Sequence, residues 1–249
     1  MSGRSYTQLE AAPVHATIAR LAQRVEERFP DSGLSRVSRE LVRLAEENSA
    51  VIQHNRRPLW WLRVAATATL AVLVGILVWA AARLLRIVDR GASSVAELLQ
   101  GTDAAVNELI FLSLAAFFLS SLETRFKRRR ALRMIHRLRG AAHVIDMHQL
   151  TKDPEQALHP LPPTLSSPER PLDRLQLARY LEYCSEMFAL ISKLAVLHAQ
   201  YLQDPVVLEA VNDIESLTAG LSRKVWQKIT ILNIAATPGA AREAGFTPA

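Results

Sequence analysis

Residues 64–82 read VAATATLAVLVGILVWAAA and contain no charged side chain. About 20 apolar residues are needed to cross the hydrocarbon core of a bilayer as a helix, so this run is long enough to span it. Trp60 and Trp61 stand before the run and Trp79 near its end, and indole rings prefer the headgroup level. The alternative is a buried core helix, but a soluble helix of this length normally keeps a polar face. The stretch therefore predicts a first transmembrane helix within residues 58–90.

A second apolar run, LIFLSLAAFFLSSL, covers residues 109–122 and is bracketed by Glu108 and Glu123. Alone it is short for a membrane span, but extending it toward the N-terminus gives enough length if Glu108 lies at the interface. The alternative is a re-entrant segment beside a single anchor. We expect a second transmembrane helix at 104–125, joined to the first by an outer connection at 91–103.

The chain that follows the second run is strongly basic and reads ETRFKRRRALRMIHRLRG from residue 123 onward. From Asp89 to Asn107, by contrast, the chain carries three acids and a single basic residue, Arg90, although Arg83 and Arg86 at the end of the first span weaken the difference. The positive-inside rule then places both termini in the cytoplasm. The net charge of +6 favours an anionic partner, and no nucleic-acid reading motif is present, so none is expected to bind. We expect contact with anionic lipid headgroups through Arg125, Lys127, Arg128, Arg129, Arg130 and Arg133.

Amphipathic helices are predicted on both sides of the hairpin. Residues 1–57 read as two helices separated by Pro30, with Asp31 as an N-cap for the second. That second helix has apolar residues at heptad spacing, with Asn48 at a core position. It either packs on its own chain or acts as an oligomerising coiled coil. The seam consists of Leu34, Val37, Leu41, Leu44, Asn48 and Val51.

The remaining cytoplasmic segments are also helical in pattern. Residues 126–152 continue the second span without a break and predict a long stalk helix. Its apolar face is formed by Leu132, Ile135, Leu138, Ala142 and Ile145. A proline-rich linker follows at 153–172, then an antiparallel helical hairpin at 173–237 whose second helix begins after Asp204-Pro205. Residues 238–249 read as a disordered tail.

Few residues suggest chemistry. His143 and Asp146 share one helical face and His136 lies one heptad upstream, so a zinc or other divalent ion is one interpretation. The usual pair of histidines four residues apart is missing, and a His–Asp hydrogen bond that stabilises the stalk is the alternative. The single cysteine, Cys184, forms no internal disulfide and reads as a small core residue. No phosphate loop or nucleophile elbow is present, so we expect neither an enzyme nor a cofactor.

Both spans carry stripes of small side chains, which allow helices to approach closely. The stripes consist of Thr67, Ala71 and Gly75 in the first span and of Ser113, Ala116 and Ser120 in the second. They either pack the two helices of one hairpin together or let several hairpins assemble around a pore.

The sequence thus predicts an all-α, two-span membrane protein with a helical hairpin, a stalk and cytoplasmic helices on both sides. Because Ala, Arg and Leu are abundant, as in GC-rich bacteria, we expect the inner (plasma) membrane as its location. The first functional hypothesis is a membrane-anchored scaffold with a cytoplasmic protein partner. The alternatives are a homo-oligomeric pore or membrane-disrupting effector, and a metal-dependent membrane enzyme. The sequence names no substrate, partner or subunit number.

Overall fold

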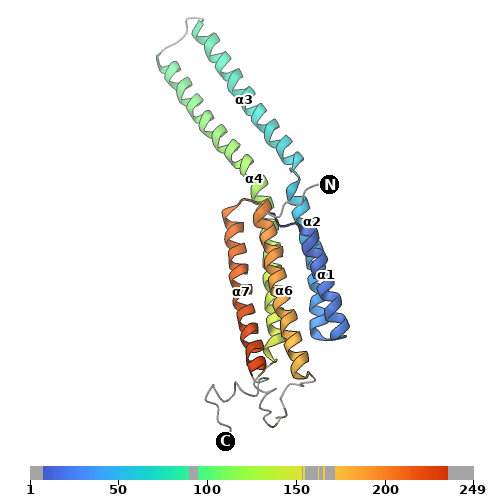
Figure 1. Cartoon of the computed structure of the whole chain (residues 1–249). Coiled ribbons are helices and arrows are strands. Elements are labelled where there is room, and N and C mark those ends of the chain that lie inside the picture. The colour runs from blue at the N-terminus through green and yellow to red at the C-terminus, as the bar shows by residue number, and fades with distance from the viewer. Residues whose placement is uncertain are drawn as a thin grey trace. The chain divides into compact units, whose positions relative to one another are not determined.

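The computed structural model describes residues 8–89, 95–152 and 172–234, together with residues 154, 162 and 165. Every regular element in these residues is a helix, which confirms the all-α prediction. The chain divides into two compact units. One consists of Met1–Asn55 and Arg130–Ala249 and is called the bundle unit below; the other, Arg56–Arg129, is called the hairpin unit. Figure 1 shows the helices of both units.

Five helical segments build the bundle unit. They are α1 (Ala11–Arg28), α2 (Gly33–Arg56), the C-terminal part of α4 (Val95–Leu150), α6 (Arg174–Tyr201) and α7 (Pro205–Ile234). One hydrophobic core joins them, and its largest fully buried side chains come from four of the five segments. These side chains include Ile18, Leu21, Leu34, Leu41, Leu138, Ile145, Phe188 and Ile191.

The predicted stalk helix is present, and its cytoplasmic part belongs to the bundle unit. The helix does run on without a break and ends at Leu150, as expected. However, Ile135, Leu138, Ala142 and Ile145 lie in the core of the bundle unit, and Leu132 packs against it. An amphipathic helix in water buries its apolar face against a partner, and here α2, α6 and α7 contact the segment. The predicted apolar face of this segment therefore packs in the core of the bundle unit.

The predicted seam of α2 also lies in the chain's own core. Leu34, Leu41, Leu44 and Asn48 are buried, and Val37 packs partly buried against the core. This agrees with the interpretation that α2 packs on its own chain.

The turn between α1 and α2 corrects the predicted cap. Ser32, and not Asp31, caps α2: the Ser35 backbone N–H donates to Ser32 Oγ at 3.1 Å. Asp31 instead adopts a left-handed φ of 54°, a conformation that Asp tolerates better than most residues. The first helix ends before Pro30, as expected. Asp31, in its left-handed conformation, then turns the chain so that Ser32 can cap α2.

The predicted start of the last helix is confirmed. Asp204 Oδ1 accepts hydrogen bonds from the backbone N–H groups of Val206 and Val207 at 3.1 and 3.3 Å. Pro205 occupies the first helical position, where a missing N–H has no cost. The side chain of Asp204 is therefore buried as a cap.

The hairpin unit contains α3 (Trp60–Asp89) and the N-terminal part of α4. α4 begins at Val95, so residues 95–103, which the sequence assigned to the outer connection, are helical. The segment VAELLQ consists of helix formers, and a single Gly101 does not stop propagation. Within the residues whose side chains are described, the stretch 106–150 of α4 is long and apolar enough to cross a membrane. The apolar stretch Arg63–Trp79 of α3 is shorter.

Candidate membrane-contact surface

The hairpin unit exposes large apolar side chains on both of its helices. Phe111 and Phe117 of α4 are 70% and 69% exposed, and Val72 of α3 is 62% exposed. Soluble monomers rarely expose apolar patches larger than a few hundred square ångström. Further exposed members are Trp60, Trp61, Val64, Val74, Ile76, Val78, Trp79, Ile110, Leu114 and Phe118.

Fewer of the hairpin unit's described side chains are shielded than exposed. Ala66, Leu73, Leu77 and Ala82 of α3 are half-buried, as is Leu59 just before the helix. On α4 the shielded positions recur at intervals of three and four residues, which defines one helical face. They are Glu108, Leu112, Ala115, Leu119 and Glu123, and Ser121, Leu122, Lys127 and Arg128 are half-buried as well. Most of the other described side chains on the apolar stretches of the two helices are exposed.

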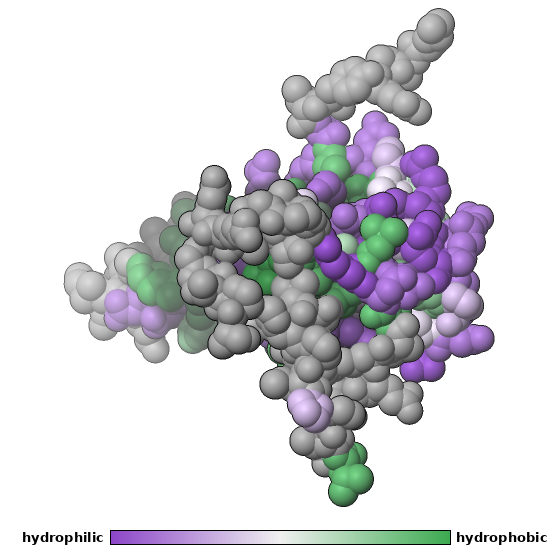
Figure 2. All heavy atoms as spheres, turned by 60° about the horizontal axis from the view of Figure 1, so that its bottom comes forward, coloured by the Kyte–Doolittle hydropathy of each residue, from purple (hydrophilic) through white to green (hydrophobic). Residues whose placement is uncertain are grey.

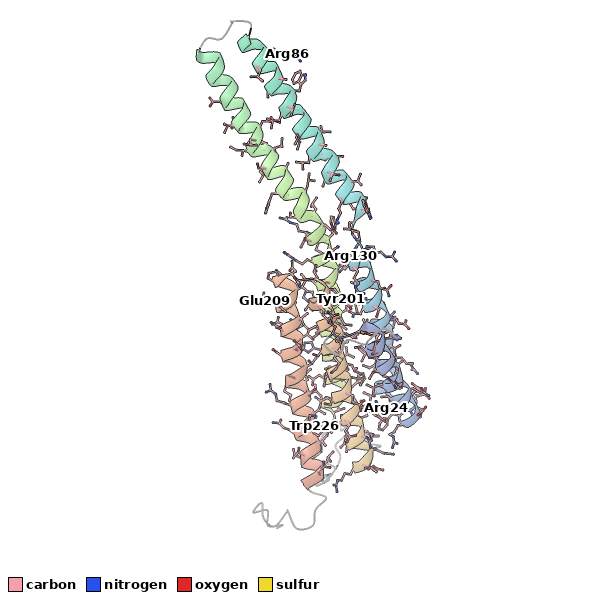
Figure 3. The ribbon with its side chains drawn as sticks, turned by 45° about the horizontal axis from the view of Figure 1, so that its top comes forward. Arg24, Arg86, Arg130, Tyr201, Glu209 and Trp226 are labelled. Atoms are coloured by element: carbon pink, nitrogen blue, oxygen red, sulfur yellow. The ribbon has the colours of Figure 1, made fainter. Side chains whose placement is uncertain are left out.

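Tryptophans mark two levels of α3. Trp61 and Trp79 lie about 27 Å apart along a helix that rises about 1.5 Å per residue. That spacing is close to the ~30 Å thickness of a bilayer's hydrocarbon core, and both indoles are well exposed, at 65% and 63%. Arg86 lies beyond Trp79, toward the end of α3 from which the connection departs (Figure 3).

An ion cluster joins the two helices at the level of the first tryptophans. Arg63 Nε donates to Glu123 Oε2 at 2.9 Å, and Lys127 Nζ lies 2.8 Å from Glu123 Oε1. The backbone N–H of Leu59 also points to this carboxylate, at 3.5 Å. The Glu123 side chain is 16% exposed, whereas that of Arg63 is 59% exposed. The cluster connects the start of α3 to α4 and supplies basic groups beside Trp60 and Trp61.

The basic residues predicted to contact lipid are distributed over both units. In the hairpin unit, Arg125 and Arg129 are exposed, while Lys127 and Arg128 are half-buried. The Arg125 guanidinium lies over the Phe118 ring, 5.6 Å from its centroid, a cation–π arrangement. In the bundle unit, Arg133 is exposed and Arg130 is half-buried. Lipid contact by these side chains stays a prediction.

The small-residue stripe of α3 does not face α4. Thr67 and Ala71 are exposed, and a Cβ added to Gly75 would meet nothing within 4 Å. On α4, Ser113 is exposed and donates to Leu109 O at 2.8 Å, whereas the side chains of Ala116 and Ser120 lie outside the described residues. Packing within the hairpin therefore does not explain the α3 stripe.

The candidate metal ligands do not form a site. His136 and His143 are exposed on α4, and Asp146 accepts a hydrogen bond from Gln149 Nε2 at 2.6 Å. No group of three or more potential metal ligands occurs among the described residues. The predicted His–Asp hydrogen bond is likewise replaced by the Asp146–Gln149 bond, because the amide lies one turn further along the same face.

A buried polar pair joins α2 and α6 in the bundle unit. His198 and Asn48 are 2% and 0% exposed, and His198 Nε2 lies 2.7 Å from Asn48 Oδ1. Asn48 Nδ2 donates to Leu194 O at 3.3 Å, so its oxygen faces the imidazole, which must donate. Burial lowers the pKa of His198 to about 4. The heptad spacing singled out Asn48, but nothing in the sequence paired it with a residue so distant.

Two further groups of the bundle unit are inert or structural. Cys184 is fully buried, as predicted, and burial raises the pKa of its thiol to about 12. Lys228 of α7 donates to the carbonyl oxygens of Gln149 and Lys152 at 2.9 and 3.2 Å. A cation at these carbonyls satisfies acceptors that a helix C-terminus leaves open.

A shallow cavity of about 250 Å³ lies between α2 and the C-terminal part of α4. Its walls are apolar, from Val37, Leu41, Leu44, Ala141, Val144 and Ile145, with Glu40 and Arg137 at the rim. Arg137 pairs with Glu47 of α2, so the rim carries matched charges.

At the bundle end turned to the viewer in Figure 2, hydrophilic residues predominate over the described surface.

Comparisons with protein-family models, curated proteins and solved structures found no match for this chain.

Proposed function

We propose that the protein is an integral membrane protein of the bacterial inner membrane, and that it holds a cytoplasmic helical bundle at the bilayer surface as a scaffold. The exposed apolar surface of the hairpin unit carries this proposal. Side chains such as Phe111, Phe117 and Val72 would be unfavourable in water but match lipid acyl chains. The tryptophan spacing on α3 and the basic groups near Trp60 support the same interpretation.

The proposed topology has two spans with both termini in the cytoplasm. The basic residues that follow Glu123 favour the cytoplasmic side, and the connection at 91–103 would then lie outside. Arg86 weakens this bias but does not reverse it, since the excess of basic residues after Glu123 is much larger.

Membrane fractionation and reporter fusions test the topology. The protein should remain in membranes after an alkaline carbonate wash. A periplasm-active reporter inserted between residues 92 and 102 should be active, and the same reporter at the C-terminus should be silent. Release by the wash would contradict insertion, and an active C-terminal reporter would contradict the orientation.

The scaffold role requires a protein bound to the bundle unit. A photo-crosslinker at His143, exposed on α4, should give one discrete adduct with another protein in native membranes. The same crosslinker at Phe111 serves as the control, because it should react with lipid. Absence of a protein adduct from His143 and from exposed Trp226 of α7 (labelled in Figure 3) would argue against a scaffold.

A homo-oligomeric pore is the second candidate, and one observation favours it. Thr67, Ala71 and Gly75 face away from α4 within the hairpin unit, so this stripe is available to a helix of another copy. Light scattering of the detergent-solubilised protein should then give a ring-sized particle that Gly75→Leu reduces to monomers. Val74→Leu is the matched control. A monomeric wild-type protein that is silent in planar bilayers would remove this candidate.

A further inference from the structure

The turn between α6 and α7 forms a tip without exposed charge. Residues 201–208 read YLQDPVVL, and the carboxylate of Asp204 is buried as the cap of α7, with the residue 4% exposed. Val206 and Leu208, in contrast, are 42% and 51% exposed. The tip therefore presents aliphatic side chains together with Gln203 and Pro205.

Hydrogen bonds within the bundle unit show at which end this tip lies. Tyr180 of α6 donates to His148 O at 3.4 Å, and Lys228 of α7 donates to Gln149 Oε1 at 2.8 Å. Along helices that rise about 1.5 Å per residue, Tyr201 lies ~32 Å beyond Tyr180, and Arg130 lies ~27 Å from His148 in the same direction. Figure 3 labels Arg130, Tyr201 and Glu209 near this one end of the bundle unit.

The same end carries both connections to the hairpin unit. His198 contacts Asn48, about two helical turns before α2 ends at Arg56. Residues 57–59 then lead to α3, while α4 passes through residues 129 and 130 without a break. The apolar tip is thus at the end of the bundle unit from which the chain enters the proposed membrane segment.

We propose that the α6–α7 turn is a second lipid-contact site, at which Val206 and Leu208 enter the boundary between headgroups and acyl chains. The inference rests on the proposed membrane insertion of the hairpin unit. The partner is the phospholipid surface itself: the tip offers apolar area and no exposed cation, so the contact depends on aliphatic burial and persists at high salt. Glu209, the next exposed residue, limits the depth because a carboxylate stays in water.

Lipid-borne quenchers test the contact on the full chain. Leu208→Cys, labelled with an environment-sensitive fluorophore, is reconstituted into phosphatidylcholine–phosphatidylglycerol vesicles that contain a headgroup nitroxide lipid. Leu175→Cys, at 77% exposure near the start of α6, is the matched water-facing control, and Ile76→Cys reports on the hairpin. Cys184 is buried with a raised thiol pKa, so it should stay unlabelled, and the labelled wild type provides the blank.

We expect quenching at residue 208 comparable with that at residue 76, unchanged by 1 M salt, and none at residue 175. Val206→Cys should repeat the result and guards against a defect peculiar to one variant. Quenching at 76 without quenching at 206 and 208 would overturn the turn contact and leave the proposed insertion intact. No quenching at any position would overturn both. Quenching at 208 that is lost in salt would show an electrostatic contact and would also overturn the proposal.

Discussion

α3 and α7 have the same length, 30 residues each, yet they present opposite surfaces. In α7, apolar and polar side chains alternate at helical spacing, so Val207, Val211 and Ile214 are buried while Glu209 faces water. Residues 64–82 of α3 carry no charge on any face, and most of the described side chains of α3 are exposed. A helix that keeps a charged face is adapted to water on that side. A helix without one is adapted to an apolar surrounding, which the chain itself does not provide.

The comparison is sharpest for two phenylalanines. Phe188 of the bundle unit is fully buried, whereas Phe117 of the hairpin unit is 69% exposed. Phe188→Ala should lower the free energy of unfolding of the bundle by about 3–5 kcal/mol, because it leaves a cavity in a packed core. Phe117→Ala should change it by less than ~1 kcal/mol. Chemical denaturation in detergent measures both; equal effects would show that the two units are not packed differently.

An arginine introduced on the exposed surface of α3 or of α6 tests whether that surface faces lipid or water. Val72→Arg should cost ~3 kcal/mol of membrane insertion, so that much of the protein leaves the membrane fraction. Leu175→Arg on α6 is the control and should change stability by about 0.5 kcal/mol or less, because that side chain already faces water. Normal fractionation of Val72→Arg would mean that the apolar surface of α3 is covered by protein.

The bundle should also respond to pH through its buried pair. The pKa of His198 is about 4 in the folded protein, below its ordinary 6.5. Between these two pH values the imidazole is therefore protonated in the unfolded chain and neutral in the folded one. Stability is therefore fully present above pH 6.5 and falls as pH drops from 6.5 toward 4, by up to about 3 kcal/mol. Thermal melts in detergent between pH 7 and 5 measure this slope.

His198→Gln provides the control for the pH effect, since a neutral amide can still donate to Asn48 but does not titrate in this range. Its melting temperature should vary less with pH than that of the wild type. An identical pH slope in both proteins would assign the effect to other groups.

Substitutions at two glycines should have the smallest effects on the stability of the bundle, with opposite signs. A Cβ on Gly33 would lie 2.5 Å from His148 Cε1, so Gly33→Ala should destabilise the bundle by about 1–3 kcal/mol through overpacking. Gly140, in the same unit, has nothing within 4 Å of an added Cβ. Gly140→Ala should stabilise α4 by about 0.5–1 kcal/mol. Thermal melts of the two variants check the signs, and a harmless Gly33→Ala would mean that His148 can move aside.

Much of the fold could be predicted from local sequence patterns. The all-α class, the end of α4 at Leu150, the start of α7 after Asp204-Pro205 and the burial of Cys184 follow from spacing, capping and helix-breaking residues. The errors occurred where short-range rules compete. Asp31 and Ser32 are both good caps, and α4 begins at Val95 because the residues of the expected connection are also helix formers.

The sequence by itself determined which faces of the helices are apolar, because the periodicity of side chains along a helix is a local property. Only the tertiary structure decided what covers those faces: the apolar face of residues 130–150 packs in one core with side chains of α1, α2, α6 and α7. It also paired Asn48 of α2 with His198 of α6. Such pairings depend on how separate helices dock, and the free energy of docking is a sum over many contacts that no single stretch of sequence contains.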